Sequence, residues 1–157
     1  MLKKLIYGIV VIVIIGIGWF LLSPIFLNVE VNEELSSTST NNITPLVLRK
    51  GTFKKADESH TGQGEALLYQ NPDKSHFLRF ENFTVTNGPD LVVYLVKHEN
   101  PTNKSHVTDG FVKLAKLKGN MGNQNYDIPK DLDLTQYKSV VIWCELFGVL
   151  FSPAALK

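Results

Sequence analysis

The longest apolar stretch of the sequence lies near its N-terminus. Leu5–Leu22 contains no charged side chain, and a helix of this length is about 27 Å long, close to the hydrocarbon thickness of a bilayer. Lys3 and Lys4 precede the stretch, and acidic residues follow it from Glu30 onward. Because basic flanks stay in the cytoplasm, we expect residues 1–27 to form a single-pass transmembrane signal anchor, with the rest of the chain extracytoplasmic.

A cleaved signal peptide is the alternative interpretation of this segment. Such a peptide usually has an apolar core of about 7–15 residues, followed by small residues at the cleavage site. The stretch here is longer, and Leu21-Leu22-Ser23-Pro24 offers one small residue after it. The pattern therefore favours an uncleaved anchor that contacts the lipid bilayer through Leu5–Leu22.

Residues 28–45 have a different composition, rich in Ser, Thr and Asn. A segment of this kind buries too little apolar surface to offset the conformational entropy lost on ordering. We therefore expect a flexible tether between the anchor and the folded domain.

From residue 46 onward, short apolar stretches alternate with turn-forming residues. Ser75–Thr86 changes the parity of its apolar positions near Glu81-Asn82, which predicts a β-bulge there. Leu91–Val96 and Ser139–Leu146 are apolar and β-branched enough to be central strands. We expect residues 46–157 to form an all-β domain, an antiparallel β-sandwich or barrel.

Composition narrows the classes of function. The 157 residues include 16 Lys+Arg and 15 Asp+Glu, a net charge of +1, so nothing indicates the dense basic face that nucleic-acid binding requires. The single cysteine excludes an intramolecular disulfide and a cysteine-based zinc site. The four histidines show no recognised ligand spacing, so no metal site is predicted. No motif in the sequence identifies a cofactor.

The single cysteine, Cys144, allows two interpretations. Strand alternation places it on the same face as Val140, Ile142 and Leu146, where it would pack as a small buried hydrophobic side chain of low reactivity. In an oxidising compartment an unpaired thiol is a liability, and its presence also fits a redox or ligand role. Strand geometry alone leaves both open.

Several motifs follow one another through the predicted domain. They are Gly51-Thr52-Phe53, His60-x-Gly62-x-Gly64, Leu78-Arg79-Phe80-Glu81-Asn82-Phe83, Asn87-Gly88-Pro89-Asp90-Leu91, Leu117-Lys118-Gly119-Asn120-x-Gly122 and Ser139-Val140-Val141-Ile142-Trp143-Cys144. In this order, over about residues 47–156, they resemble the DM-thirteen domain family.

The resemblance implies a β-sandwich outside the cytoplasm with a role in electron transfer. The characteristic cysteine of the family matches Cys144, which makes this residue the candidate redox group. Members of the family accompany DOMON and cytochrome b-type membrane domains in larger proteins, which implies a separate redox partner protein. We therefore expect an accessory redox or binding domain rather than an enzyme.

Three functional hypotheses follow. The first is a membrane-anchored redox domain that acts through Cys144, with Trp143 beside it in the sequence. The second is a non-catalytic module that binds a ligand or protein through loops around His60 and Asn87–Asp90. The third, by analogy with DOMON domains, is a haem- or metal-binding sandwich with His60 or Met121 as ligands.

Overall fold

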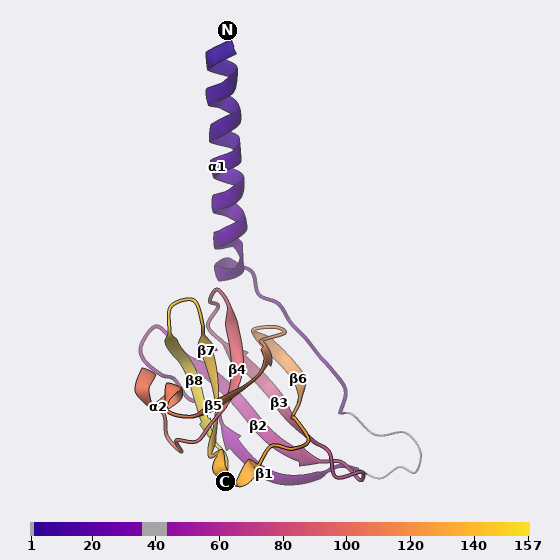
Figure 1. Ribbon diagram of the computed structural model, residues 1–157. Coiled ribbons are helices and arrows are strands. Elements are labelled where there is room, and N and C mark those ends of the chain that lie inside the picture. Colours follow the sequence, from indigo (N-terminus) through magenta and orange to yellow (C-terminus); the bar gives the residue numbers. More distant parts are fainter. Residues whose placement is uncertain (1, 36–43) are drawn as a thin grey trace.

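The computed structural model describes residues 2–35 and 44–157, which form one long helix and a domain of two β-sheets (Figure 1). The helices are α1 (Leu2–Phe26), α2 (Lys104–Thr108) and the short 3-10 helix η1 (Leu134–Gln136). The strands are β1 (Leu46–Thr52), β2 (Gly62–Gln70), β3 (His76–Val85), β4 (Leu91–Val96), β5 (Phe111–Lys116), β6 (Met121–Asp127), β7 (Ser139–Cys144) and β8 (Val149–Ala155).

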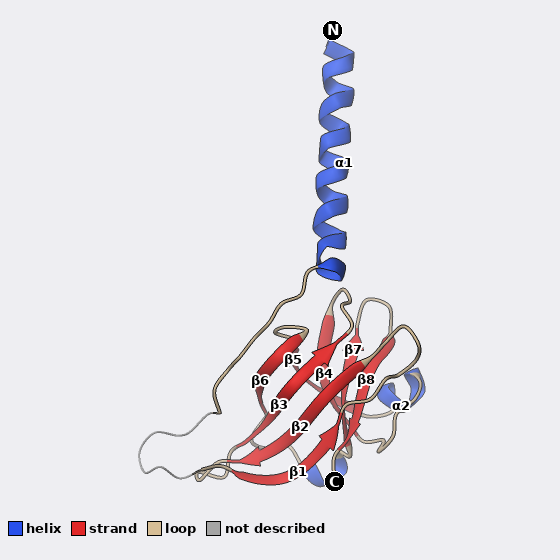
Figure 2. Cartoon of the chain, turned by 180° about the vertical axis from the view of Figure 1, so that it is seen from behind, coloured by secondary structure: helices blue, strands red, loops and turns tan. Residues whose placement is uncertain are grey.

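The two sheets have four strands each and are antiparallel throughout. Their strand orders are β1-β2-β3-β6 and β5-β4-β7-β8, and Figure 2 shows the first sheet in front of the second. The expected all-β antiparallel sandwich is confirmed. The barrel alternative is not observed, because neither sheet closes on itself. Backbone hydrogen bonds of 2.9 Å between Lys50 and Lys157 join the two sheets along one side.

The predicted bulge in β3 is present, and it directs two phenylalanine side chains into the core. The register between β3 and β6 shifts between Phe80 and Phe83, and Asn82 between them adopts a positive φ of 48°. As a result the Phe80 and Phe83 side chains both point inward and are fully buried. Their rings pack at 4.8 Å and 4.9 Å from the ring of Phe53 on the neighbouring segment.

The first part of the expected tether lies against the sandwich. Residues 28–35, which we name the strap, run along the free edge of β6 (Figure 1). Glu30 pairs with Met121 in a parallel bridge, and the amide of Glu33 donates to the carbonyl of Asn123 at 2.9 Å. The strap therefore continues the sheet instead of hanging free. Residues 36–43 of the expected tether lie outside the described residues.

Two glycines and an ion pair hold the strap in place. A Cβ atom on Gly119 would lie 2.4 Å from the carbonyl oxygen of Val29, and one on Gly122 would lie 2.2 Å from that of Val31. Lys118 forms an ion pair with Glu33 at 2.7 Å, and the amide of Asn125 donates to the same carboxylate at 2.7 Å. The β6 edge thus matches this segment in shape as well as in charge.

The expected transmembrane span receives no support from the described residues. Within that part of the chain we find no helix with enough apolar length to cross a bilayer.

The carboxylate of Glu33 predicts a pH dependence of stability. Burial by itself would raise the Glu33 pKa, but hydrogen bonds from Lys118 and from the Asn125 amide outweigh burial and hold this pKa below its ordinary value of 4.5. A lowered folded-state pKa stabilises the folded protein above the unfolded-state pKa, and this contribution is lost as the pH falls through the folded-state value. Glu33→Gln should therefore lower Tm at about pH 7 but not at about pH 2–3, where both proteins carry a neutral side chain.

Thermal unfolding followed by circular dichroism measures this difference. The effect should stay below about 1 kcal/mol, because the Glu33 and Lys118 side chains are 34% and 39% exposed. Glu58→Gln is the control, since its ion pair with Lys55 is exposed on a loop and should change little at any pH. An equal loss of stability for Glu33→Gln at every pH would show that Glu33 acts through packing and not through its charge.

Candidate functional site

Four loops meet at one end of the sandwich, the end that lies next to α1 (Figure 1). We name this region the loop end; it consists of residues 53–61, 86–90, 117–120 and 145–148. Residues far apart in the sequence meet here because antiparallel strands alternate in direction, so every second connection returns to the same end.

Cys144 lies at this end, inside the core. It is the last residue of β7, pairs with Leu91 on β4 and with Val149 on β8, and has no exposed surface. Its Sγ donates a hydrogen bond to the carbonyl oxygen of Pro89 at 3.0 Å. The loop of residues 86–90, which we name the covering loop, therefore packs against the thiol.

Strand alternation correctly predicted that Cys144 faces the core with Val140 and Ile142. It wrongly placed Leu146 on the same face. Val140 and Ile142 are buried in the same cluster as the thiol. Leu146, expected on that face, is instead 64% exposed, because β7 ends at Cys144 and a turn of residues 145–148 follows.

The covering loop is itself fixed by side chains around it. A Cβ atom on Gly88 would lie 2.5 Å from the ring of Phe151, so the loop packs closely on that ring. Asp90 adopts a positive φ of 53° and forms an ion pair with Lys116 at 3.0 Å. The side-chain amide of Asn87 donates to Asn28 of the strap at 2.9 Å. Asn87 and Asp90 thus both have structural partners.

His60 also lies at the loop end. Its ring is 4.3 Å from that of Phe151, the ring on which Gly88 packs, and its Nδ1 is 2.7 Å from a carboxylate oxygen of Asp57. The hydrogen bond to His60 is the main reason why the pKa of Asp57 lies below its usual value. His60 and the covering loop therefore both pack on the Phe151 ring, which belongs to the same core cluster as Cys144.

The other two candidates lie apart from the thiol. Trp143 points to the outer face of its sheet, where it is 4% exposed and packs in a second cluster with Val92 and Leu150. Met121 begins β6, and its backbone pairs with the strap. The geometry brings neither side chain to Cys144.

One polar network at this end has no signal in the sequence. The hydroxyl of Tyr94 donates to Glu145 at 2.5 Å, and Lys113 donates to the other oxygen of that carboxylate at 2.5 Å. Burial, reinforced by the hydrogen bond with Glu145, raises the pKa of Tyr94. The three residues come from β4, β5 and the β7–β8 turn, so only strand pairing could have revealed them.

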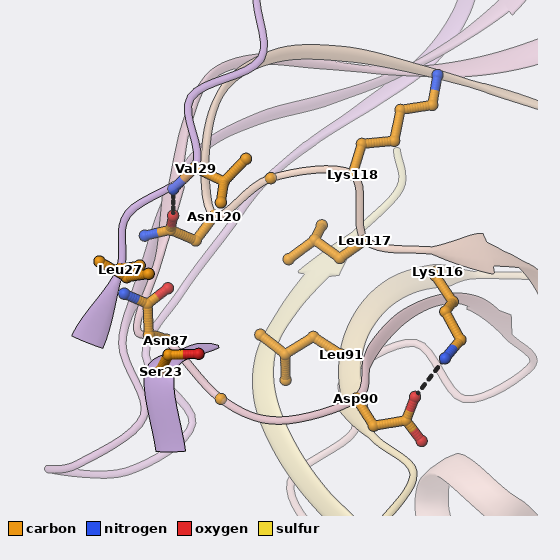
Figure 3. Close-up of a pocket in the computed structure, with 12 residues that line it drawn as sticks. Ser23, Leu27, Val29, Asn87, Asp90, Leu91, Lys116, Leu117, Lys118 and Asn120 are labelled. Carbon is orange, nitrogen blue, oxygen red and sulfur yellow. Dashed lines mark hydrogen bonds and ion pairs between the residues drawn. The ribbon is translucent and has the colours of Figure 1, made fainter. Parts of the chain in front are cut away.

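A groove opens beside the covering loop (Figure 3). It has a volume of about 750 Å³ and lies between the end of α1, the covering loop and the loop of residues 117–120. Leu27, Leu91 and Leu117 supply apolar walls, and the Lys116–Asp90 ion pair lies at one side. Among the described residues, no group of three or more His, Cys, Asp or Glu side chains could hold a metal ion.

The fold and the buried thiol define a class of protein, a two-sheet β-sandwich with a single cysteine beneath its loop end. A family model described as "Electron transfer DM13" matches residues 52–156. The chain therefore belongs to the DM13 family of electron-transfer domains, as the sequence motifs indicated. No curated protein and no solved structure matches the chain.

The packing of Gly88 on Phe151 predicts how the thiol can be exposed. Gly88→Ala places a methyl group against a ring that is only 5% exposed, so the loop should move away from Cys144. We expect the native-state reaction of Cys144 with a coloured disulfide reagent to become roughly tenfold faster, because less free energy is needed to open the loop locally.

Gly110→Ala provides the control for a general loss of stability. Unlike Gly88, Gly110 has a positive φ, of 130°, so alanine strains the backbone there, and its Cβ would meet the flexible side chain of Lys97, away from the thiol. If both variants change the reaction rate equally, then opening of the covering loop does not limit access to Cys144.

Proposed function

We propose that this protein is a membrane-anchored, extracytoplasmic electron-transfer domain in which Cys144 is the redox group. Membership of the DM13 family supports a redox-related role. The observation that carries the assignment to Cys144 is its position: the thiol is the last residue of β7 and is covered by the Pro89 carbonyl of a single loop. A small displacement of residues 86–90 would bring the sulfur to the surface.

The chemistry open to a single cysteine is thiol–disulfide exchange with a partner. The Cys144 thiol loses its proton and attacks a disulfide of the partner, which forms a mixed disulfide and releases the second partner sulfur as a thiol. No further oxidant is consumed in this step. Since the thiol is hydrogen-bonded to Pro89 in the closed state, movement of the loop would regulate when the step occurs.

The membrane anchor is the second part of the proposal. It is supported by the uncharged sequence Leu5–Leu22, which includes residues whose side chains the structure does not describe. It is also supported by the exposure of apolar side chains on α1, which ranges from 47% at Val10 to 71% at Tyr7. An extended patch of this kind is unusual on a surface that faces water.

A binding module is the alternative function. The groove beside the covering loop favours it, because apolar walls and a charged pair at the rim are typical of a ligand site. A haem or metal function is not proposed. His60 is paired with Asp57 and packed on Phe151, while Met121 lies at the strap.

Glutathione disulfide tests the redox assignment on the full chain in detergent. We expect the native protein to gain one glutathione, detected by mass spectrometry at Cys144, and to lose it on treatment with a dithiol. Cys144→Ala should gain none, and Gly88→Ala should react faster than the wild type. A native thiol that stays unmodified, while the denatured chain reacts fully, would remove the redox role and favour the binding module.

A further inference from the structure

The connection between α1 and the sandwich is very short. The helix ends at Phe26, and the side chain of Asn28 already accepts hydrogen bonds from Asn87 at 2.9 Å and from Asn120 at 3.0 Å. One extended residue spans at most about 3.6 Å. With only Leu27 between the two elements, the loop end must stay within a few ångströms of the helix terminus.

The contacts that follow extend this attachment along the strap. The amide of Val29 donates to the side chain of Asn120 at 2.7 Å, as Figure 3 shows. Further along, the amide of Val31 donates to the carbonyl of Met121 at 3.0 Å, before the Glu33 contacts with β6. A membrane-inserted α1 would therefore hold the sandwich by its loop end.

An apolar tip projects from this same end. Leu146 and Phe147 form the centre of the β7–β8 turn and are 64% and 67% exposed. Gly148 closes the turn with a positive φ of 62°, which keeps both side chains outside the core. Figures 1 and 2 both show this turn beside the end of α1.

Basic side chains lie next to the tip. The ammonium group of Lys104 is 3.0 Å from where a Cβ of Gly148 would be, and Lys113 pairs with Glu145 at the base of the turn. Apolar and aromatic residues bordered by lysines are the composition that favours the interface between lipid headgroups and acyl chains.

We propose that the sandwich docks its loop end on the bilayer surface, with Leu146 and Phe147 inserted among the lipids. This inference rests on the proposed membrane anchor and adds to it a fixed orientation of the domain. Cys144 directly precedes the inserted turn, so its buried thiol and the loop that covers it lie close to the membrane surface. Its redox partner must then reach it along the membrane surface, and not from the surrounding solution.

Fluorescence quenching by lipids tests the orientation on the full chain in phosphatidylcholine vesicles. Leu146→Cys carries an environment-sensitive fluorophore, and the vesicles contain lipids with a nitroxide near the headgroup. The matched control is Leu46→Cys, because Leu46 is 62% exposed and begins β1 at the opposite end of the sandwich, beside Gln70. The wild type gives the background from the buried Cys144.

The label at position 146 should be quenched at least about twofold more than the label at position 46. Adding Phe147→Asp to the Leu146→Cys protein should reduce this difference by about half or more, since a charge opposes insertion. Equal quenching at both positions would overturn the docking. A label at position 146 that is shielded only at high protein concentration, without lipid quenching, would show self-association instead and would also overturn it.

A third label separates the docking from the anchor on which it rests. Ile12→Cys lies in the middle of α1 and should be quenched by lipids that carry the nitroxide deep in the acyl chain. Quenching at position 12 without quenching at position 146 overturns the docking alone. Loss of quenching at both positions overturns the anchor and the docking together.

Discussion

The structure depends on the complete burial of β4 and β7. Every residue of these two paired strands is buried. The opposite sheet covers their inner face, and the outer face is buried in the cluster that includes Val107 and Trp143. Two adjacent strands with no polar face must lie at the centre of their sheet, since at an edge their apolar side chains would be exposed to water. The other strands and the loops take their places around this pair.

The position of the thiol follows from this constraint. Cys144 ends β7 opposite Leu91, where β4 begins, so the loop that leads into β4 must pass over the sulfur. Pro89 in that loop supplies the hydrogen-bond acceptor, and Phe151 supports the loop through its contact with Gly88. The core thus protects the thiol from water, and the loop of residues 86–90 contacts the sulfur directly.

The strap joins this core to the N-terminal helix. It occupies the outer edge of β6, which would otherwise offer unpaired backbone groups to other chains. Because it begins at Asn28 with contacts to two loops, movement of the helix relative to the domain is restricted at the end where the thiol lies. The strap and the loop that covers Cys144 are therefore connected through Asn87, which belongs to that loop and donates a hydrogen bond to Asn28 of the strap.

The sequence by itself determined the elements that depend on local pattern. The apolar strands β4 and β7, the bulge at Asn82 and the inward direction of Cys144 all follow from strand alternation and turn chemistry. Only the tertiary structure decided that residues 28–35 pair with β6, that Leu146 is exposed and that Tyr94 meets Glu145 and Lys113. From its composition we expected the strap to be too polar to order, but its order comes from glycines and charges on β6 and the loop before it, about 90 residues away. Such contacts depend on which edges the fold brings side by side, and no local pattern encodes that choice.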